Sequence, residues 1–267
     1  MISIMLNKKQ YEDSSRFDAR VYLNAKFKTN PHSWSRWIFD QLPQRQGMKI
    51  LELGCGTGLV WLANRDRIPA SWDISLSDYS EGMLEKTQHN LSRLTRNFSY
   101  HVVHAEHIGF EDDRFDVVMA NLMLYHVENR ARALLEIRRI MKKDGLFATT
   151  TYGDDNMLEL NVIFHRFLEG MGKSPVRRKN PFSLENGREQ LSHVFGNIEL
   201  RRYENALEVN EIDPIVNYFL SLNDMFDDTV MLGENDAEAF REYLKKIFNE
   251  RKSIRVTKDT GMFLCTP

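Results

Sequence analysis

One stretch constrains this chain more than any other: residues 50–58, which read Ile-Leu-Glu-Leu-Gly-Cys-Gly-Thr-Gly. The apolar run at 50–53 is too short for a helix and ends at glycine, which is typical of a buried parallel strand. Three glycines at alternate positions let the backbone turn sharply and approach a ligand closely, because they carry no Cβ and tolerate positive φ. A strand, a ligand-binding turn and a helix starting near Leu59 are therefore expected.

Glu52 is the unusual residue of this stretch. A carboxylate in an apolar strand end is costly to bury unless something pairs with it, and a cationic ligand would do so. The glycines follow the pattern G-x-G-x-G, whereas the dinucleotide fingerprint is G-x-G-x-x-G. An ordinary glycine-rich turn remains the alternative, but the acid and the spacing argue against a nicotinamide-dependent oxidoreductase.

A second acid, Asp78, follows the next predicted strand. Residues 72–77 alternate between apolar and polar side chains with a period of two, which predicts a strand ending at Asp78. Ser80 is suited to cap the helix that follows. Asp78 is thus placed where ligands bind in open α/β sheets, at a strand-to-helix corner of the carboxyl edge. It could also be a simple corner residue.

Strands and helices alternate along the first half of the chain. Three further strands are predicted at 98–103, 115–120 and 146–152, with a helix at 129–142. Such alternation predicts a parallel sheet covered by helices on both faces. Beyond it we expect helices at 157–171, 213–222 and 240–248, strand-like alternation at 197–209, and a closing pair of edge strands at 254–265.

The composition is that of an ordinary globular chain. With 267 residues, of which 42% are hydrophobic and 28% charged, we expect a single domain over 1–267. A net charge of -2 gives no general attraction for nucleic acid or anionic membranes, and no apolar run has membrane-spanning length. Cys55 and Cys265 show no disulfide or metal-ligand spacing, so we predict no metal and a cytoplasmic protein; the N-terminus does not resemble a signal peptide.

Residues 52–58, Glu-Leu-Gly-Cys-Gly-Thr-Gly, resemble the first motif of the class I S-adenosylmethionine-dependent methyltransferases. The resemblance implies an α/β fold with a Rossmann-like, doubly wound, seven-stranded mixed sheet and helical lid segments. It places the core that binds S-adenosyl-L-methionine at about 49–153. An N-terminal lid is implied at about 1–45, and a C-terminal sheet edge with a helical lid insertion at about 205–251.

The resemblance also assigns residues to the cofactor. Asp78 would hold the ribose hydroxyls, while Tyr79 and Met83 occupy positions that flank the adenine, although both could simply pack in the core. Asn121 follows the fourth strand, where the backbone meets the methionine amine. The implied cofactor residues are Glu52, Gly54, Cys55, Gly56, Gly58, Asp78, Tyr79, Met83, His104, Ala105, Glu106 and Asn121.

The adenine contact departs from the family pattern. Residues 104–110, His-Ala-Glu-His-Ile-Gly-Phe, resemble a family segment, Asp-Ala-x-x-Leu-Pro-Phe, whose aspartate accepts a hydrogen bond from the adenine amino group. His104 stands in place of that aspartate. A neutral imidazole nitrogen can accept one hydrogen bond, or Glu106 takes this role instead. The backbone of Ala105 is expected to serve as in the family.

Residues 124–127, Leu-Tyr-His-Val, resemble the Leu-His-His-Val signature of many small-molecule methyltransferases. If the acceptor is a hydroxyl or amine, a base must take its proton, and histidine titrates in the suitable range. His126 is the candidate, with Tyr125 beside it facing the acceptor. The alternative is a histidine that only orients the loop. Tyr152 and His165 are weaker candidates for substrate contact.

These observations predict a methyltransferase that acts on an oxygen, nitrogen or carbon atom of a small molecule. Segments 11–42 and 211–251 would close over the site, with Tyr11, Arg20 and Tyr22 as lid residues, and closure favours a small enclosed substrate. A protein or RNA methyltransferase, or a cofactor-binding regulatory protein without turnover, remains open. The sequence identifies neither the acceptor nor the oligomeric state.

Overall fold

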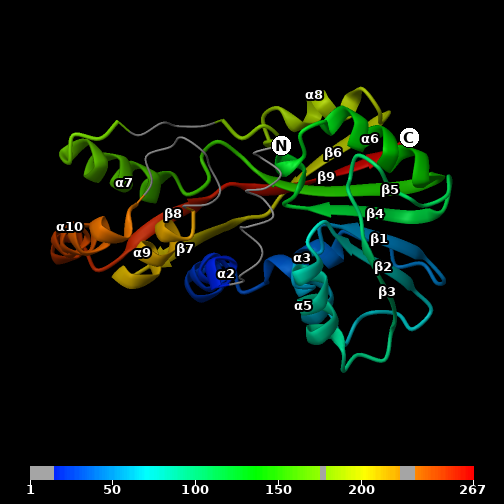
Figure 1. Ribbon diagram of the computed structural model, residues 1–267, viewed down its shortest axis with the longest axis horizontal. Helices are drawn as coiled ribbons and strands as arrows, with labels where there is room; N and C mark the ends of the chain where they lie inside the picture. The colour runs from blue at the N-terminus through cyan, green and yellow to red at the C-terminus, as the bar shows by residue number, and fades with distance from the viewer. Residues whose placement is uncertain (1–14, 175–178, 223–231) are drawn as a thin grey trace. The chain divides into compact units, whose positions relative to one another are not determined.

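The computed structural model describes residues 15–174, 179–222 and 232–267, and the chain divides into two compact units (Figure 1). The sheet unit comprises residues 32–154, 180–203 and 260–267. The helix-rich unit comprises the described residues among 1–31, 155–179 and 204–259. Each unit has an apolar core of its own. Within the described ranges, no helix combines the length and apolar character needed to cross a membrane.

The sheet unit contains a seven-stranded mixed sheet in the order β3-β2-β1-β4-β5-β9-β6. Strands β1 to β5 are parallel, while β9 runs antiparallel to both β5 and β6. This confirms the predicted Rossmann-like, doubly wound sheet. The strands are β1 (Lys49–Leu53), β2 (Asp73–Asp78), β3 (Asn97–Val102), β4 (Phe115–Asn121), β5 (Met141–Tyr152), β6 (Asn197–Arg202) and β9 (Thr260–Thr266).

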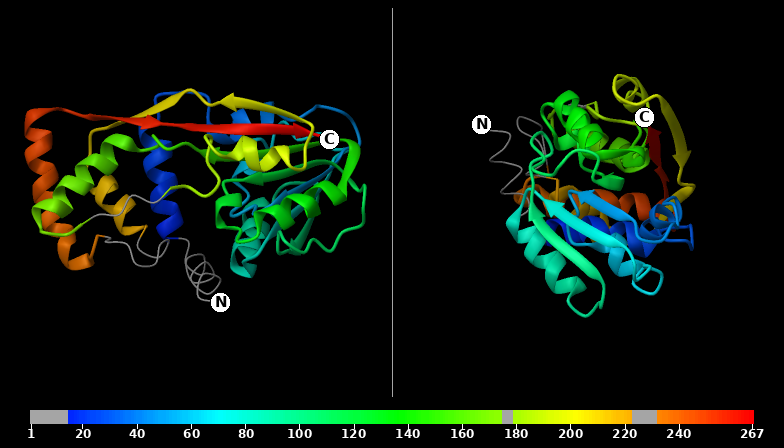
Figure 2. Two further views of the ribbon diagram at one scale, coloured as in Figure 1. Left: turned by 90° about the horizontal axis from the view of Figure 1, so that it is seen from above. Right: turned by 90° about the vertical axis from the view of Figure 1, so that its right-hand side faces the viewer.

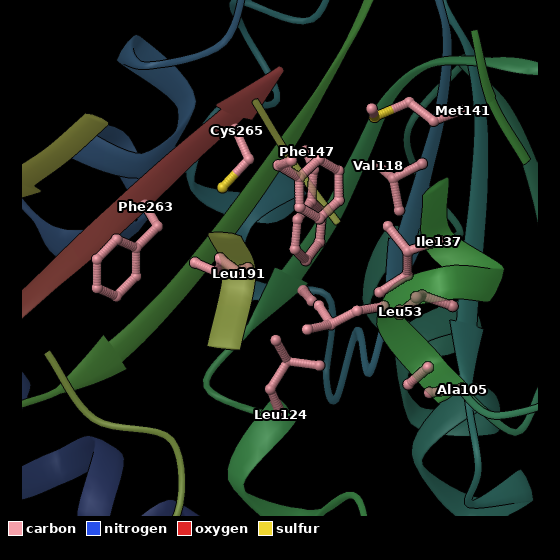
Figure 3. Close-up of a cluster of buried hydrophobic side chains, with 14 of the residues drawn as sticks. Leu53, Ala105, Val118, Leu124, Ile137, Met141, Phe147, Leu191, Phe263 and Cys265 are labelled. Carbon is pink, nitrogen blue, oxygen red and sulfur yellow. The ribbon is translucent and has the colours of Figure 1, made fainter. Parts of the chain in front are cut away.

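Helices cover both faces of the sheet, as Figure 1 shows. One apolar cluster joins the strands to α6 (Arg130–Ile140) and α8 (Gly187–Ser192); Figure 3 shows Leu53 and Val118 from the strands with Ile137 from α6. A second cluster joins the strands to helices of the opposite face, which are α3 (Trp34–Asp40), α4 (Leu59–Ala63) and α5 (Glu81–Leu91). Within the expected N-terminal lid, α3 therefore packs on the sheet.

The helix predicted at 129–142 ends earlier than expected. Asn129 caps it, because its side chain accepts a hydrogen bond from Arg132 N at 3.1 Å, but the helix stops at Ile140. Met141 adopts an extended conformation and pairs with Phe115, so β5 begins there, five residues before the predicted strand. An irregularity in the β4–β5 register then accommodates the extra residues before Leu146.

The prediction of a closing pair of edge strands at 254–265 was wrong. Strand β8 (Ile254–Lys258) pairs with β7 (Asn205–Val209) in a separate two-stranded sheet, and β9 lies between β5 and β6. Only Asp259 separates β8 from β9, which is too short for a hairpin turn. The five central residues of β9 are buried, as expected for a strand inside a sheet.

The helix-rich unit is built around the β7–β8 pair (Figure 2). Its core includes Phe164, Phe219 and Phe240, with the first two rings stacked at 4.2 Å. The helix predicted at 213–222 begins at Ile212 with Glu211 as its N-cap, so Pro214 sits in the first turn. The helices are α2 (Ser15–Phe27), α7 (Leu158–Gly170), α9 (Ile212–Leu220) and α10 (Ala237–Glu250), with a short 3-10 turn, η2 (Glu234–Asp236).

Candidate active site

The glycine turn between β1 and α4 has the backbone that its sequence predicts. Gly54, Gly56 and Gly58 have φ values of +66°, +57° and +73°, which L side chains rarely adopt. A Cβ on Gly54 would lie 2.9 Å from Met123 Cβ, whereas a Cβ on Gly56 would meet nothing within 4 Å. Gly56 therefore presents bare backbone to open space, as a loop that receives a ligand requires.

Neighbouring elements hold the turn in place. Cys55 N donates to Ser77 O at 2.9 Å, and the Thr87 hydroxyl donates to Gly56 O at 2.7 Å. Cys55 itself is buried, and burial raises the pKa of its thiol, which keeps the side chain neutral. The loop is thus fixed before any ligand arrives, and its cysteine contributes backbone rather than charge.

Glu52 lies at the end of β1 and is only 2% exposed. Trp61 Nε1 donates to its Oε2 at 2.6 Å, and Asn121 Nδ2 donates to its Oε1 at 2.7 Å. Burial raises the pKa of Glu52 to about 7, the negative charge of Asp78 adds to this, and the two hydrogen bonds oppose it. The carboxylate therefore has two neutral donors, and a cationic ligand would stabilise its charged form further.

Asp78 lies at the end of β2, beside the glycine turn. Its Oδ2 accepts a hydrogen bond from Gly56 N, and its Oδ1 accepts one from Ser80 N, both at 2.9 Å. Burial raises the pKa of Asp78, although these backbone donors oppose the shift. A carboxylate has about four lone-pair directions, so two remain for further donors such as hydroxyls. The structure thus brings Glu52, the turn and Asp78 together.

The residues predicted to flank the adenine differ in exposure. Tyr79 is 42% exposed, and its ring meets that of His104 edge-on, with centroids 5.2 Å apart. Met83, in the first turn of α5, is 2% exposed, and its N–H donates to the Ser80 hydroxyl at 3.4 Å. Tyr79 is therefore open to a planar ligand, while Met83 is enclosed by protein.

Residues 104–110, which are expected to contact the adenine, are held in place within the sheet unit by hydrogen bonds of Glu106. Glu106 Oε1 accepts from Asn129 N at 3.0 Å, and its carbonyl accepts from Arg132 Nε at 2.9 Å. His104 Nδ1 accepts from Glu106 N at 3.3 Å. Ala105 between them is buried in the apolar core. The two candidate side chains therefore both take part in protein contacts.

Tyr125 and His126 lie in a short 3-10 turn, η1 (Leu124–His126), after β4. Their rings are 4.5 Å apart, and Tyr125 also meets Tyr152 at 5.1 Å. His126 N donates to Met123 O at 2.9 Å, which fixes the turn. Tyr125, His126 and Tyr152 thus form one aromatic group at the carboxyl ends of β4 and β5.

The other candidates lie elsewhere. Arg20, Tyr22 and His165 belong to the helix-rich unit, where Arg20 donates to Ser221 O at 2.7 Å and Lys26 donates to the Tyr22 hydroxyl at 2.8 Å. Tyr11 lies outside the described residues.

The sequence interpretation missed two side chains that shape this site. The Trp61 indole is fully buried and bonded to Glu52, and the Ser77 hydroxyl donates to Glu52 O at 2.9 Å. Trp61 lies in the apolar start of α4, so the sequence pattern around it indicated core packing only. The available signal was the buried acid itself, because a carboxylate in that position requires donors nearby.

Comparisons with known proteins agree with this geometry. Residues 51–149 match the methyltransferase domain family. The chain is 32% identical over 134 residues to malonyl-acyl-carrier-protein O-methyltransferase of Geobacter sulfurreducens, covering 50% of this chain and 49% of that protein. It is 31% identical to ubiquinone/menaquinone biosynthesis C-methyltransferase UbiE of Geotalea uraniireducens, covering 49% and 57%. The chain therefore spans about half the length of these relatives.

Solved structures share the fold at low sequence identity. Haemonchus contortus phosphoethanolamine N-methyltransferase 2, solved with phosphomonomethylethanolamine and S-adenosylhomocysteine, matches with a TM-score of 0.58 and 18% identity. That match covers 98% of this chain and 58% of the other. The strand order and the glycine turn agree with the match of residues 51–149 to the methyltransferase domain family.

Proposed function

We propose that the protein transfers a methyl group from S-adenosylmethionine to an oxygen, nitrogen or carbon atom of a small-molecule acceptor. The observation that carries this proposal is the pair of acids, the buried Glu52 and the partly buried Asp78, on either side of a glycine turn that opens at Gly56. The named relatives act on three different kinds of atom. The acceptor atom therefore stays open within the proposal.

The residues present fit the cofactor. Asp78 keeps acceptor capacity for the ribose hydroxyls, and Gly56 offers bare backbone for a close approach. Glu52 supplies negative charge for the cationic methionine end. When bound, S-adenosylmethionine supplies an electrophilic methyl group on a sulfonium. Because the protein performs little covalent chemistry in such a transfer, its main contributions are positioning and exclusion of water.

His126 is proposed as the base for a hydroxyl or amine acceptor. It lies in the turn after β4, beside Tyr125, at the sheet edge that also carries Glu52 and Asp78. A positioned imidazole can take the proton that the acceptor loses as the methyl group arrives. Tyr125 and Tyr152 would present aromatic surface to the acceptor next to this base.

Closure over the acceptor by two chain segments is part of the same proposal. Segments 11–42 and 211–251 would cover the acceptor, with Arg20 and Tyr22 of α2 among the covering residues. Leu23 and Phe27 of α2 are buried in the core of the helix-rich unit. Deleting the segment would therefore damage the unit, and substitution of the half-exposed Tyr22 is a cleaner test.

Other functions require different features. A methyltransferase for RNA would need a basic surface, whereas the net charge here is -2. A cofactor-binding regulatory protein without turnover would need Glu52, Asp78 and the glycine turn, but it would not need His126. We also infer a reducing compartment such as the cytoplasm, because Cys55 and Cys265 are both free and buried.

Calorimetry with S-adenosylmethionine, S-adenosylhomocysteine and NAD tests the proposed cofactor. We expect the first two to bind and NAD not to bind. Asp78→Ala should weaken S-adenosylhomocysteine binding by about 1.5–3 kcal/mol, the range for a hydrogen bond to a charged group. Asp73→Ala is the matched control, because Asp73 lies at the opposite end of the same strand. Parental affinity in a folded Asp78→Ala protein would refute the assignment.

A further inference from the structure

One face of α6 in the sheet unit carries charged side chains that bond to the segment after β3. Arg132, Glu136 and Arg139 are four and three residues apart, so they lie on the same face of the helix. Apolar packing holds the helix on the sheet through four buried residues: Ala133, Leu134, Ile137 and Ile140. The charged face is therefore available to hold residues 104–112.

Ile108 of that segment is bonded at both of its backbone polar atoms. Its N–H donates to Glu136 Oε2 at 3.0 Å, and its carbonyl accepts from Arg139 Nη2 at 2.7 Å. Arg139 Nη1 also donates to Phe110 O at 2.8 Å and to Asp112 Oδ1 at 2.6 Å. The side chain of Ile108 is buried as well. Glu136 and Arg139 therefore fix the course of the main chain from residue 108 to residue 112.

Glu136 and Arg139 also hold each other in position. Arg139 Nε donates to Glu136 Oε1 and Nη2 donates to Glu136 Oε2, both at 2.9 Å, so the contact is bidentate. Hydrogen bonding to Arg139 lowers the pKa of Glu136, so this carboxyl is charged at neutral pH. A guanidinium can bond a carboxylate and two carbonyls together because its five N–H groups form a rigid planar fork, which the ammonium of lysine lacks.

The turn expected to contact the adenine ends directly before Ile108. His107 N donates to His104 O at 2.9 Å and closes this turn. Glu106 within the turn accepts at its carbonyl from Arg132 Nε at 2.9 Å, so the same face of α6 holds this part of the chain too. A displacement of Ile108 would therefore move the turn relative to the base.

We propose that Glu136 and Arg139 are positioning residues for the adenine of S-adenosylmethionine. They would act by fixing the main chain of the segment that contacts the base, without touching the cofactor themselves. This inference rests on the proposed function and adds specificity-determining residues to the same site. Because apolar contacts of α6 remain without the pair, its loss should affect recognition of the base more than the fold.

Calorimetry with S-adenosylhomocysteine and its purine analogue, in which hydrogen replaces the adenine amino group, tests the proposal. We expect the parent to prefer S-adenosylhomocysteine roughly three- to tenfold, the range for one hydrogen bond. Arg139→Gln should bind S-adenosylhomocysteine about tenfold more weakly, and its affinities for the two ligands should agree within about twofold. Arg138→Gln is the matched control, because Arg138 lies in the same helix but donates to Met141 O. This control should keep the parental affinities.

The ratio of the two affinities separates positioning from general damage. Damage to the glycine turn or to Asp78 would weaken both ligands equally and would keep the preference. Arg139→Lys keeps the charge beside Glu136 but not the planar fork, so its preference should lie between those of the parent and Arg139→Gln. This variant also provides the test if Arg139→Gln does not fold.

Parental preference in a folded Arg139 variant would overturn the inference and leave the proposed function intact. A parent that binds both ligands with equal affinity would do the same, because the segment would then not read the amino group. If S-adenosylhomocysteine does not bind the parent, the proposed function fails, and this inference fails with it.

Discussion

The two units bury charge of opposite sign. In the sheet unit, Glu52 is a buried carboxylate and Asp78 a partly buried one, and the donors of their hydrogen bonds within the described part of the chain are neutral. In the helix-rich unit, Lys258 is a desolvated ammonium beside a thioether. Each arrangement is stable only at a cost that a ligand of opposite charge would offset. The sheet unit therefore favours a cationic ligand, whereas the helix-rich unit carries a desolvated positive charge.

The largest expected effect concerns chemistry in the sheet unit. His126→Asn should lower turnover about 10²–10⁴-fold, the usual contribution of general-base catalysis, with an acceptor found by screening a library. The affinity for S-adenosylhomocysteine should stay at the parental value. Single-turnover kinetics measures the effect, and the unchanged affinity for S-adenosylhomocysteine is the control for damage to the turn. Parental turnover would make His126 a packing residue and leave desolvation as the main mechanism.

The sequence predicted the sheet unit well because its signals are local. The apolar run before Gly54 and the alternating segment before Asp78 mark parallel strands and their ligand edge directly, and Ser80 marks the next helix. The Trp61 bond to Glu52 could not be predicted, because an indole in an apolar helix start looks like any other core residue.

The helix-rich unit was harder to predict for a different reason. Its helices follow the apolar spacing, but the pairing of its strands depends on contacts far apart in sequence. Only Asp259 separates β8 from β9, so nothing local marks the change from one sheet to another. Lys258 consequently reads as a polar position in an edge strand, and its burial appears only in the folded chain.

The pH dependence of stability provides the next test of the comparison. Folding raises the pKa of Glu52 from 4.5 to about 7, so the folded state binds a proton that the unfolded chain releases. Stability should therefore increase as pH falls from 7 to 4.5, by roughly 3 kcal/mol from this group. Folding lowers the pKa of Lys258 from 10.5 to about 8, so its contribution, also roughly 3 kcal/mol, should increase as pH rises from 8 to 10.5.

Denaturant unfolding across this pH range measures both changes in stability. Glu52→Gln should abolish the change between pH 4.5 and 7 and leave the change between pH 8 and 10.5. Lys258→Met should do the reverse. Using the difference between each variant and the parent cancels the other titrating groups. Equal pH profiles of stability for the parent and a variant would show that the substituted charge is not desolvated. The contrast between the two units would then be wrong for the unit that carries this charge.

A smaller effect is expected on cofactor affinity. Below pH 7 the free protein holds Glu52 protonated, and this proton must leave before the carboxylate can pair with a cation. S-adenosylmethionine affinity should therefore fall about tenfold for each pH unit below 7. Titration calorimetry in buffers of different ionisation enthalpy would detect the released proton. Glu52→Gln should bind more weakly at pH 8 but without this dependence, and a parental slope in that variant would assign the proton to another group.

The smallest expected effect asks whether a side chain of the sheet unit reads the adenine. His104 Nδ1 already accepts from Glu106 N, so in the neutral ring Nε2 carries the proton and is a donor, which does not suit an amino group. Glu106 Oε2 keeps acceptor capacity, because Asn129 N occupies Oε1. Discrimination against a cofactor analogue that lacks the adenine amino group should therefore fall about two- to tenfold in Glu106→Ala, the range for one hydrogen bond. It should stay within about twofold in His104→Ala, which serves as the matched variant. Parental discrimination in both variants and in the double variant would mean that the backbone near Ala105 reads the base alone.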